Sequence, residues 1–244
     1  MLDRKPRYSV LNPYFDNPES NSEYIFTLGY TTPEHKKLHE LVFSNIAGVI
    51  ASDIDYVLPL QGHQKFLGLI ANPVNFDKVS YNELQIRDRI VIFMGINRWN
   101  YRQKGIRFFE EALEIVQSIY NDKIEVIVTE SIPYAQYITL YDRAHILLDQ
   151  VYGYDQGYNA LEAMAKGKVV FTGAEKEFTD HYGLTGRVAV NALPDVAALV
   201  EELSYLIENP EEIKAIGRRA RAFIVKEHNY ANVARRYVET WNNN

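Results

Sequence analysis

The stretch YGYDQGYNALEAMAKGKVVF, residues 152–171, is the most informative part of this sequence. It follows AHILLDQ at 144–150, an apolar run with the length and composition of a buried strand. A loop with two glycines then leads into ALEAMAK, a short segment of strong helix formers. KVVFTG at 168–173 is again strand-like. The order of strand, glycine-containing loop, helix and strand is typical of one repeat of an open α/β sheet.

The same alternation extends outward on both sides of this stretch. Further apolar runs predict strands at 89–95, 124–129 and 187–192. Amphipathic spacing, proline placement and strong helix formers predict helices at 105–120, 133–143, 158–166, 194–208, 210–227 and 230–242. Strands that alternate with helices predict the α/β class, and within it a Rossmann-like, doubly wound parallel sheet.

The first third of the chain has a different pattern. Residues 1–35 are rich in turn signals, and a short helix is expected at 35–43. The apolar run at 46–52 predicts a buried strand, 67–71 is another apolar run, and the polar residues 76–88 predict a linker. We therefore expect two parts: a partial N-terminal domain at 1–75 and a larger domain at 76–244.

Composition excludes several classes of function. The chain has 244 residues, a net charge of −6 and no cysteine. Disulfides, thiolate nucleophiles and cysteine zinc sites are therefore excluded. Basic residues do not dominate the charge, which argues against a general nucleic-acid partner. His35 and His39 have helical spacing, but no carboxylate pair accompanies them, so no metal site is predicted.

Hydropathy predicts a cytoplasmic protein without an integral membrane segment. No apolar run reaches the roughly 20 residues that a membrane helix needs. The first residues also lack the continuous apolar segment of a signal peptide.

The loops after the predicted strands carry the candidate site, because parallel α/β sheets bind ligands beyond the carboxyl ends of their strands. Gly157 begins a helix whose free backbone N–H groups suit an anionic phosphate. Glu162 lies one turn further on, where its carboxylate suits two neighbouring hydroxyls, such as those of a ribose. The spacing of Glu162 fits equally well with an acid on the helix surface near the positive end of the dipole.

A second loop, GINRWNYRQKG at 95–105, follows the strand at 89–95 and lies on the same edge of the predicted sheet. It brings Arg98, Arg102 and Lys104, which are suited to neutralising a diphosphate. Taken alone, the loop reads as a solvated basic segment. It contains neither a Walker loop nor a GxGxxG fingerprint.

These motifs resemble a known family. DQGYNALEAMAKGKVVFTG at 155–173 is similar to the signature of retaining GT-B glycosyltransferases of the glycogen-synthase-like group, also called group 1. GINRWNYRQKG is similar to the phosphate-binding loop of that family, and 194–241 to its closing helices. The resemblance covers roughly residues 85–244.

The resemblance implies a role for each matching residue. Glu162 would hold the donor ribose, and Lys104, with either Arg98 or Arg102, would neutralise the diphosphate and stabilise the leaving group. Thr129 and the loop to position 133 would line the base pocket. The residues expected to face the diphosphate or the sugar are Gly157, Tyr158 and Asn159. The donor would be a UDP- or GDP-linked sugar, and no metal or other cofactor is expected.

Two departures from the family matter. The family has two glutamates separated by seven residues, and the first would fall on Tyr154. Asp155 offers a carboxylate next to it, whereas Tyr154 offers a hydroxyl and a ring, and the sequence leaves both possibilities open. The part before the linker resembles only the tail of an acceptor-side domain, with its last strand at 46–52 and the hinge at 72–75.

We therefore expect retaining hexosyl transfer from a nucleotide-diphosphate sugar to a glycan or lipid-linked acceptor. This chain would supply the donor-binding domain and transfer weakly or not at all alone. A nucleotide-sugar epimerase of the same fold is one alternative. A non-catalytic module that binds sugar nucleotides or other proteins is another, and Tyr154 and the short N-terminal part favour it.

Overall fold

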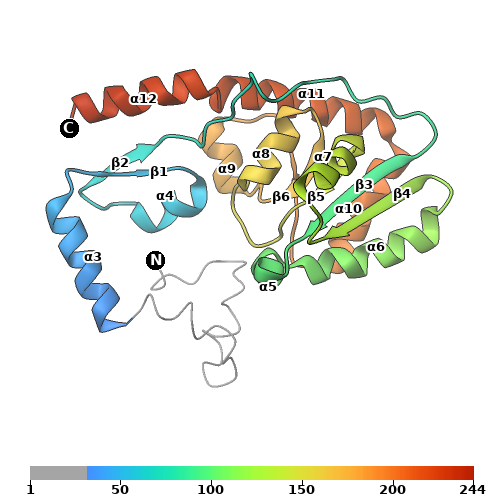
Figure 1. Cartoon of the computed structure of the whole chain (residues 1–244), viewed down its shortest axis with the longest axis horizontal. Helices are drawn as coiled ribbons and strands as arrows, with labels where there is room; N and C mark the ends of the chain where they lie inside the picture. The colour runs from blue at the N-terminus through green and yellow to red at the C-terminus, as the bar shows by residue number, and fades with distance from the viewer. Residues whose placement is uncertain (1–31) are drawn as a thin grey trace.

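The structure is a computed structural model that describes residues 32–244, so predictions for residues 1–31 lie outside it. A five-stranded sheet with helices on both faces forms the larger part of the molecule (Figure 1). Its strands, in spatial order, are β4 (Ile124–Glu130), β3 (Ile90–Ile96), β5 (Ile146–Leu148), β6 (Val169–Thr172) and β7 (Val190–Asn191). Every pair is parallel. The predicted doubly wound parallel sheet is confirmed.

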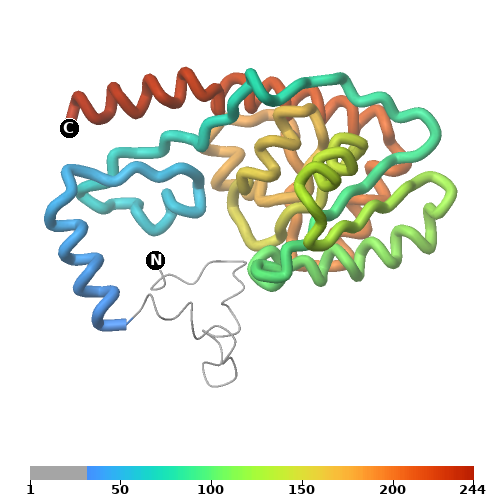
Figure 2. Tube along the Cα trace, in the orientation of Figure 1, coloured from blue at the N-terminus to red at the C-terminus, as the bar shows by residue number. Residues whose placement is uncertain are grey.

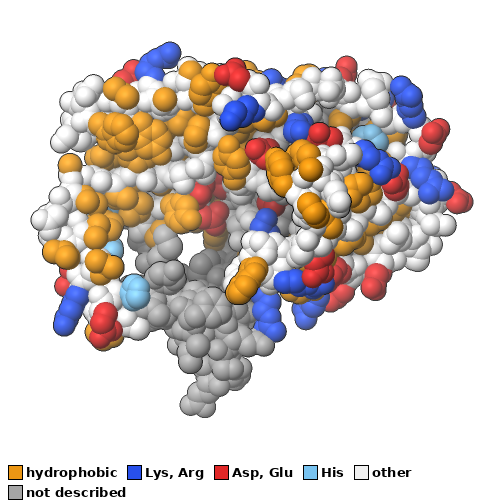
Figure 3. Space-filling view, in the orientation of Figure 1, with side chains coloured by type: hydrophobic (Ala, Val, Ile, Leu, Met, Phe, Trp, Pro, Cys, Tyr) orange, Lys and Arg blue, Asp and Glu red, His pale blue; other side chains and the backbone are white. Residues whose placement is uncertain are grey.

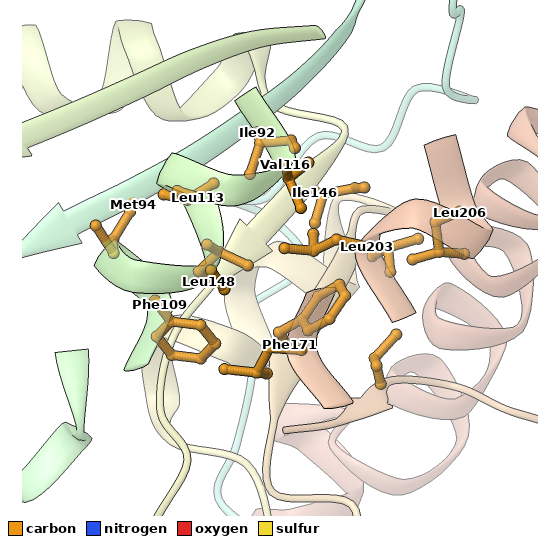
Figure 4. Close-up of a cluster of buried hydrophobic side chains, with 14 of the residues drawn as sticks. Ile92, Met94, Phe109, Leu113, Val116, Ile146, Leu148, Phe171, Leu203 and Leu206 are labelled. Carbon is orange, nitrogen blue, oxygen red and sulfur yellow. The ribbon is translucent and has the colours of Figure 1, made fainter. Parts of the chain in front are cut away.

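The core lies on both faces of this sheet, because adjacent residues of a strand point to opposite faces. On β3, Ile92 and Met94 pack in one buried cluster, whereas Phe93 between them packs in another. β5 repeats the pattern, with Leu148 in the first cluster and Leu147 in the second. Figure 4 shows the first cluster between the sheet and two helices. Burial on both faces explains why the strands read as continuous apolar runs.

Helices follow the strands as the alternation predicts. Their bounds are α5 (Tyr101–Lys104), α6 (Ile106–Tyr120), α7 (Tyr134–Arg143), α8 (Tyr158–Ala165), α9 (Lys176–Tyr182), α10 (Val196–Glu208), α11 (Pro210–Glu227) and α12 (Tyr230–Asn242), with a 3-10 turn, η4, at Arg98–Asn100. α6 and α10 cover one face of the sheet, and α7 and α8 cover the other.

The N-terminal part contains α3 (Pro33–Asn45), β1 (Val49–Ala51), α4 (Ile54–Leu60) and β2 (Phe66–Leu69). β1 and β2 pair in parallel. α12 runs back towards this part (Figures 1 and 2). The guanidinium of Arg236 on α12 donates to the carbonyl of Leu69 at 2.9 Å, and the amide of Val74 donates to the carbonyl of His228 at 2.7 Å. The proposed division at 75/76 stays a prediction.

One expectation is wrong, and two helices were not predicted. The strand at 46–52 is not the last of the N-terminal part, because β2 follows it. α4 was not predicted; its side-chain cap, Asp53, accepts from the amide of Tyr56, but Pro59 inside the helix obscured the pattern. α9 was also not predicted, and it begins three residues after the strand expected at 168–173. It has seven residues and one buried side chain, too few for helical periodicity to show.

The strand order places a topological switch beside β3. The chain passes from β3 to its neighbour β4 on one side, then returns to β5 on the other side. The loops that leave β3 and β5 therefore diverge, and a crevice forms between them at the carboxyl edge of the sheet.

Gly217 on α11 tests how tightly the helices pack on this sheet. A Cβ at this position would lie 2.1 Å from the carbonyl oxygen of Gly167, in the turn between α8 and β6. We expect Gly217→Ala to destabilise the protein by roughly 2–4 kcal/mol, because backbone must move to relieve the clash. Urea unfolding measures the change.

Gly183→Asn is the matched control. Gly183 has a φ of 60° and open space around its Cα, and Asn tolerates this left-handed conformation. Its unfolding free energy should change by less than about 1 kcal/mol. An unchanged midpoint for Gly217→Ala would show that α11 shifts without cost.

Candidate functional site

A pocket of about 420 Å³ opens at the carboxyl edge of β3 and β4, beside the switch point. This volume lies within the range of small-molecule sites. The first turns of α7 and α8 contribute to its wall. The pocket is lined by Gly95, Ile96, Asn97, Asn100, Lys104, Thr129, Ser131, Ile132, Tyr137 and Asn159.

Lys104 is fixed at this pocket by the glycine that follows it. Gly105 has a φ of 65°, and a Cβ there would lie 2.3 Å from Cγ2 of Val151. The amide of Val151 donates to the carbonyl of Lys104 at 3.0 Å. The turn therefore requires glycine and holds Lys104 against the segment that follows β5.

The ammonium of Lys104 forms an ion pair with Asp149, the residue after β5. Nζ lies 2.7 Å from Oδ1, and the Asp149 side chain is fully buried while that of Lys104 is 26% exposed. The amide nitrogen of Asn159 also donates to Oδ1, at 3.4 Å, and the hydroxyl of Thr172 donates to Oδ2 at 3.4 Å. Asp149 thus joins three elements behind the pocket wall.

Tyr137 extends this network. Its hydroxyl donates to the side-chain oxygen of Asn159 at 3.2 Å. Burial, with a smaller contribution from the charge of Asp149, raises the pKa of Tyr137 to about 12. The phenol is therefore a neutral donor at physiological pH. Gly95 makes room for it, because a Cβ there would lie 2.7 Å from the Tyr137 ring.

The N-terminus of α8 faces the same network. Gly157 is its N-cap residue, and no side chain in the described part of the chain caps it. A Cβ on Gly157 would lie 3.4 Å from Oδ2 of Asp149, so the loop passes close to this carboxylate. The uncapped N–H groups and the helix dipole provide positive potential next to Lys104.

The loop after β4 forms the opposite wall. Thr129 and Ile132 line the pocket, as the resemblance implies for a base pocket. Ser131 between them has a φ of 52°, an uncommon conformation for a residue other than glycine. Such strained positions cluster at ligand sites.

The two predicted arginines lie outside the pocket. Arg98 makes a bidentate ion pair with Glu130, with N–O distances of 2.7 and 2.6 Å. Arg102 is exposed on α5. At the surface near α5, Lys and Arg side chains lie beside Asp and Glu side chains (Figure 3). Of the three predicted cations, only Lys104 lines the pocket.

Glu162 and Tyr158 also lie outside the pocket lining. Glu162 is half-buried one turn along α8, and burial raises its pKa while the charge of Lys166 opposes the rise. Tyr158 is 51% exposed. Their contacts with a donor remain predictions.

Tyr154 and Asp155 face the N-terminal part of the chain. The carboxylate of Asp55 accepts from the amide of Tyr154 at 3.1 Å and from the amide of Asp155 at 3.2 Å. Oδ2 of Asp155 accepts in turn from the amide of Ile54 at 3.1 Å. The segment predicted to supply a sugar-contacting carboxylate therefore ties the glycine-containing loop to the start of α4, and neither residue lines the pocket.

Sequence reasoning missed several residues in the pocket wall or directly behind it. Asp149, behind the wall, is the first polar residue after the apolar run of β5, and this position is the signal that could have identified it. Asn97 and Asn100 lie inside the basic loop, in which only the charged residues were predicted to bind a ligand. Tyr137 has no local signal, because its place in the pocket depends on how α7 packs on β3.

A family model described as glycosyl transferase-like matches residues 89–239. The chain belongs to this family. The match includes the basic loop, the central motif and the closing helices of this glycosyl transferase-like chain. A search of curated proteins finds no match.

Solved GT-B glycosyltransferases share the fold of this glycosyl transferase-like chain. TarM of S. aureus, in complex with fondaparinux, alpha-GlcNAc-glycerol and UDP, is 13% identical with a TM-score of 0.59, over 82% of this chain and 44% of TarM. Sucrose-phosphate synthase of Thermosynechococcus elongatus is 17% identical, with a TM-score of 0.64, over 89% of this chain and 65% of the synthase chain. HepE of Anabaena, in complex with UDP and glucose, is 14% identical, with a TM-score of 0.62, over 86% of this chain and 68% of HepE. The chain therefore spans about half to two thirds of these proteins.

The described residues contain neither a membrane-spanning helix nor a cluster of metal ligands. No helix in 32–244 has both the length and the apolar character needed to cross a bilayer. No cluster of three or more potential metal ligands occurs in the same range.

The contact between α4 and the glycine-containing loop generates a pH prediction. Burial raises the pKa of Asp155 to about 7, against a usual value of 3.8, and the charges of Asp53 and Asp55 contribute to the rise. The folded state therefore favours the protonated carboxyl of Asp155. The contribution of this group to the free energy of unfolding is lost as the pH rises towards 7. The free-energy advantage of the wild type over Asp155→Asn should fall by roughly 2–3 kcal/mol between about pH 5 and about pH 8.

Urea unfolding of both proteins across this range makes the measurement. The free-energy advantage of the wild type over Asp55→Asn should also fall with pH. This fall should end about one pH unit lower, because burial raises the pKa of Asp55 to about 6. An advantage that grows with pH would mean that the native state favours the ionised Asp155.

Proposed function

We propose that this chain binds a UDP- or GDP-linked sugar in the pocket beside the switch point and supplies the donor-binding half of a retaining hexosyltransferase. One observation carries the proposal. The ammonium of Lys104 and the uncapped N-terminus of α8 converge on a pocket of about 420 Å³. A cation and a helix N-terminus at one site suit a diphosphate.

The pocket walls suit the rest of the nucleotide. The loop through Thr129 and Ile132 offers a partly apolar wall for the base. The side-chain oxygen of Asn100 is buried at the same pocket without a hydrogen-bond partner in the described residues. A buried acceptor of this kind needs a donor, such as an N–H of a base or a hydroxyl of a ribose. Glu162 would hold the ribose hydroxyls if the donor extends along α8.

The mechanism we propose is electrostatic. The oxygen of the acceptor hydroxyl forms the new bond to the anomeric carbon on the face from which the diphosphate departs. The bond between that carbon and the diphosphate oxygen breaks, and the hydroxyl proton passes to the departing diphosphate. Lys104 stabilises the negative charge that develops on the departing diphosphate, and such preorganised charge is a large term in catalysis. The acceptor would be a glycan or a lipid-linked acceptor in the cytoplasm. Because the chain spans only part of its structural relatives, we propose that it transfers hexose weakly by itself.

A non-catalytic module is the second candidate. Among the described residues, no carboxylate lines the pocket, and the carboxylate of Asp155 is engaged with the amide of Ile54. Such a module would bind the nucleotide sugar but would transfer nothing when an acceptor-side domain is added. Product formation from a labelled donor by a longer chain separates the two candidates.

Isothermal titration with UDP, GDP and ADP tests the donor site. We expect micromolar binding of one uracil or guanine nucleotide. Lys104→Met should weaken it about tenfold or more, because it removes the one lysine of the pocket. Lys123→Met is the matched control, since Lys123 lies in the turn before β4 at the opposite edge of the sheet and should leave the affinity unchanged. Absence of binding by all three nucleotides would contradict the proposal.

The predicted ribose contact has a separate test. Glu162→Ala should weaken binding of the preferred nucleotide about tenfold, because two hydrogen bonds to a charged acceptor are lost. The 2′-deoxy form of the same nucleotide should show a smaller difference between wild type and variant. Glu114→Ala, an exposed acid on α6, serves as the control. Equal losses for the ribose and deoxyribose forms would place Glu162 away from the 2′-hydroxyl.

A further inference from the structure

The positive charge of the Lys104 side chain at the pocket is paired with a buried negative charge before any ligand binds. Lys104 is the one charged side chain among the lining residues. Directly behind it, Asp149 carries the opposite charge at 2.7 Å, and its side chain is fully buried. No second cation in the described part of the chain pairs with Asp149. The negative charge of this buried carboxylate opposes the retention of a diphosphate beside Lys104.

Asp149 also orients the polar groups of this wall. Its Oδ1 accepts from both Lys104 and Asn159, and Asn159 in turn accepts from Tyr137. These three side chains line the pocket, whereas Asp149 does not. An ammonium has three N–H donors, so Lys104 can keep its bond to Asp149 while its other donors face a ligand.

We propose that Asp149 is a positioning residue and counter-charge, which directs Lys104 into the pocket and, by its own negative charge, weakens the retention of a nucleoside diphosphate. This inference rests on the proposed function. Lowering the affinity for the diphosphate product suits a transferase, because product release often limits turnover. Uniformly tight binding of donor and product would not speed the transfer step.

Asp149→Asn is the decisive variant. The asparagine keeps the shape of the side chain and an oxygen that accepts from Lys104 and Asn159, and its amide nitrogen can donate to the hydroxyl of Thr172. Only the negative charge is lost. We expect UDP or GDP, whichever the wild type binds, to bind about tenfold more tightly, because a repulsive charge close to the diphosphate is removed. The gain should shrink as salt is added.

Two control variants separate charge from structure. Thr172→Val removes the donor to Oδ2 but leaves the charge of Asp149, so it should not tighten binding. Asp142→Asn removes the carboxylate of another Asp–Lys pair, with Lys166, at the opposite edge of the sheet, and should leave the affinity within about twofold of wild type. A second neutral variant, Asp149→Ser, repeats the main test with a smaller side chain. Circular dichroism checks the fold of each protein.

The outcomes are distinct. Tighter binding by a folded Asp149→Asn or Asp149→Ser, without tightening by the two controls, supports the inference. Unchanged or weaker binding by folded neutral variants, while the wild type binds, overturns it and leaves the proposed function standing. Failure of both neutral variants to fold would assign Asp149 to the fold alone and also overturn it. A wild type that binds no nucleotide overturns the proposed function, and this inference with it.

Discussion

The burial of both faces of a short parallel sheet is the constraint on which the rest of this structure depends. β5 has three residues and β6 has four, so each strand offers few hydrogen bonds, and stability must come from the side chains above and below. Helices must then cover both faces, and the connections between parallel strands must cross over the sheet. Close helix packing follows, and at Gly217 the backbones of α11 and the turn before β6 approach too closely for any side chain. The loops at the carboxyl edge are what remains free for chemistry.

The same constraint explains why the candidate site lies where it does. Because β3 has β4 on one side and β5 on the other, the two loops that leave β3 and β5 separate, and the pocket lies at this edge. Lys104 comes from one of these loops and Asp149 from the other. Their ion pair joins the two loops at the point where the strand order reverses. The charges at the pocket and the packing at this edge of the sheet therefore depend on the same contacts.

Long apolar runs and helical periodicity predicted the sheet and most of its helices, because these patterns are imposed locally by burial. The glycine-containing loop was also predictable, since a helix N-terminus after a strand has a recognisable composition. Side-chain direction was not predictable. Arg98 and Lys104 look equivalent in the sequence, yet Arg98 pairs with Glu130 at the rim while Lys104 points to Asp149. Asp155 was one of two candidates for a sugar contact, and the structure shows its carboxylate accepting from the amide of Ile54, which is 101 residues away in the chain. Such contacts arise only after distant segments pack.

The return of α12 to β2 has a mechanical consequence. The polypeptide crosses between the smaller and the larger part twice, near Val74 and near His228, and the two crossings are joined by hydrogen bonds and a parallel β-bridge. A single connecting segment would leave the two parts free to rotate about it. Two connecting segments that are hydrogen-bonded to each other resist such twisting. Rotation of the smaller part against the larger one is therefore opposed both by this pair of crossings and by the hydrogen bonds between α4 and the loop before α8.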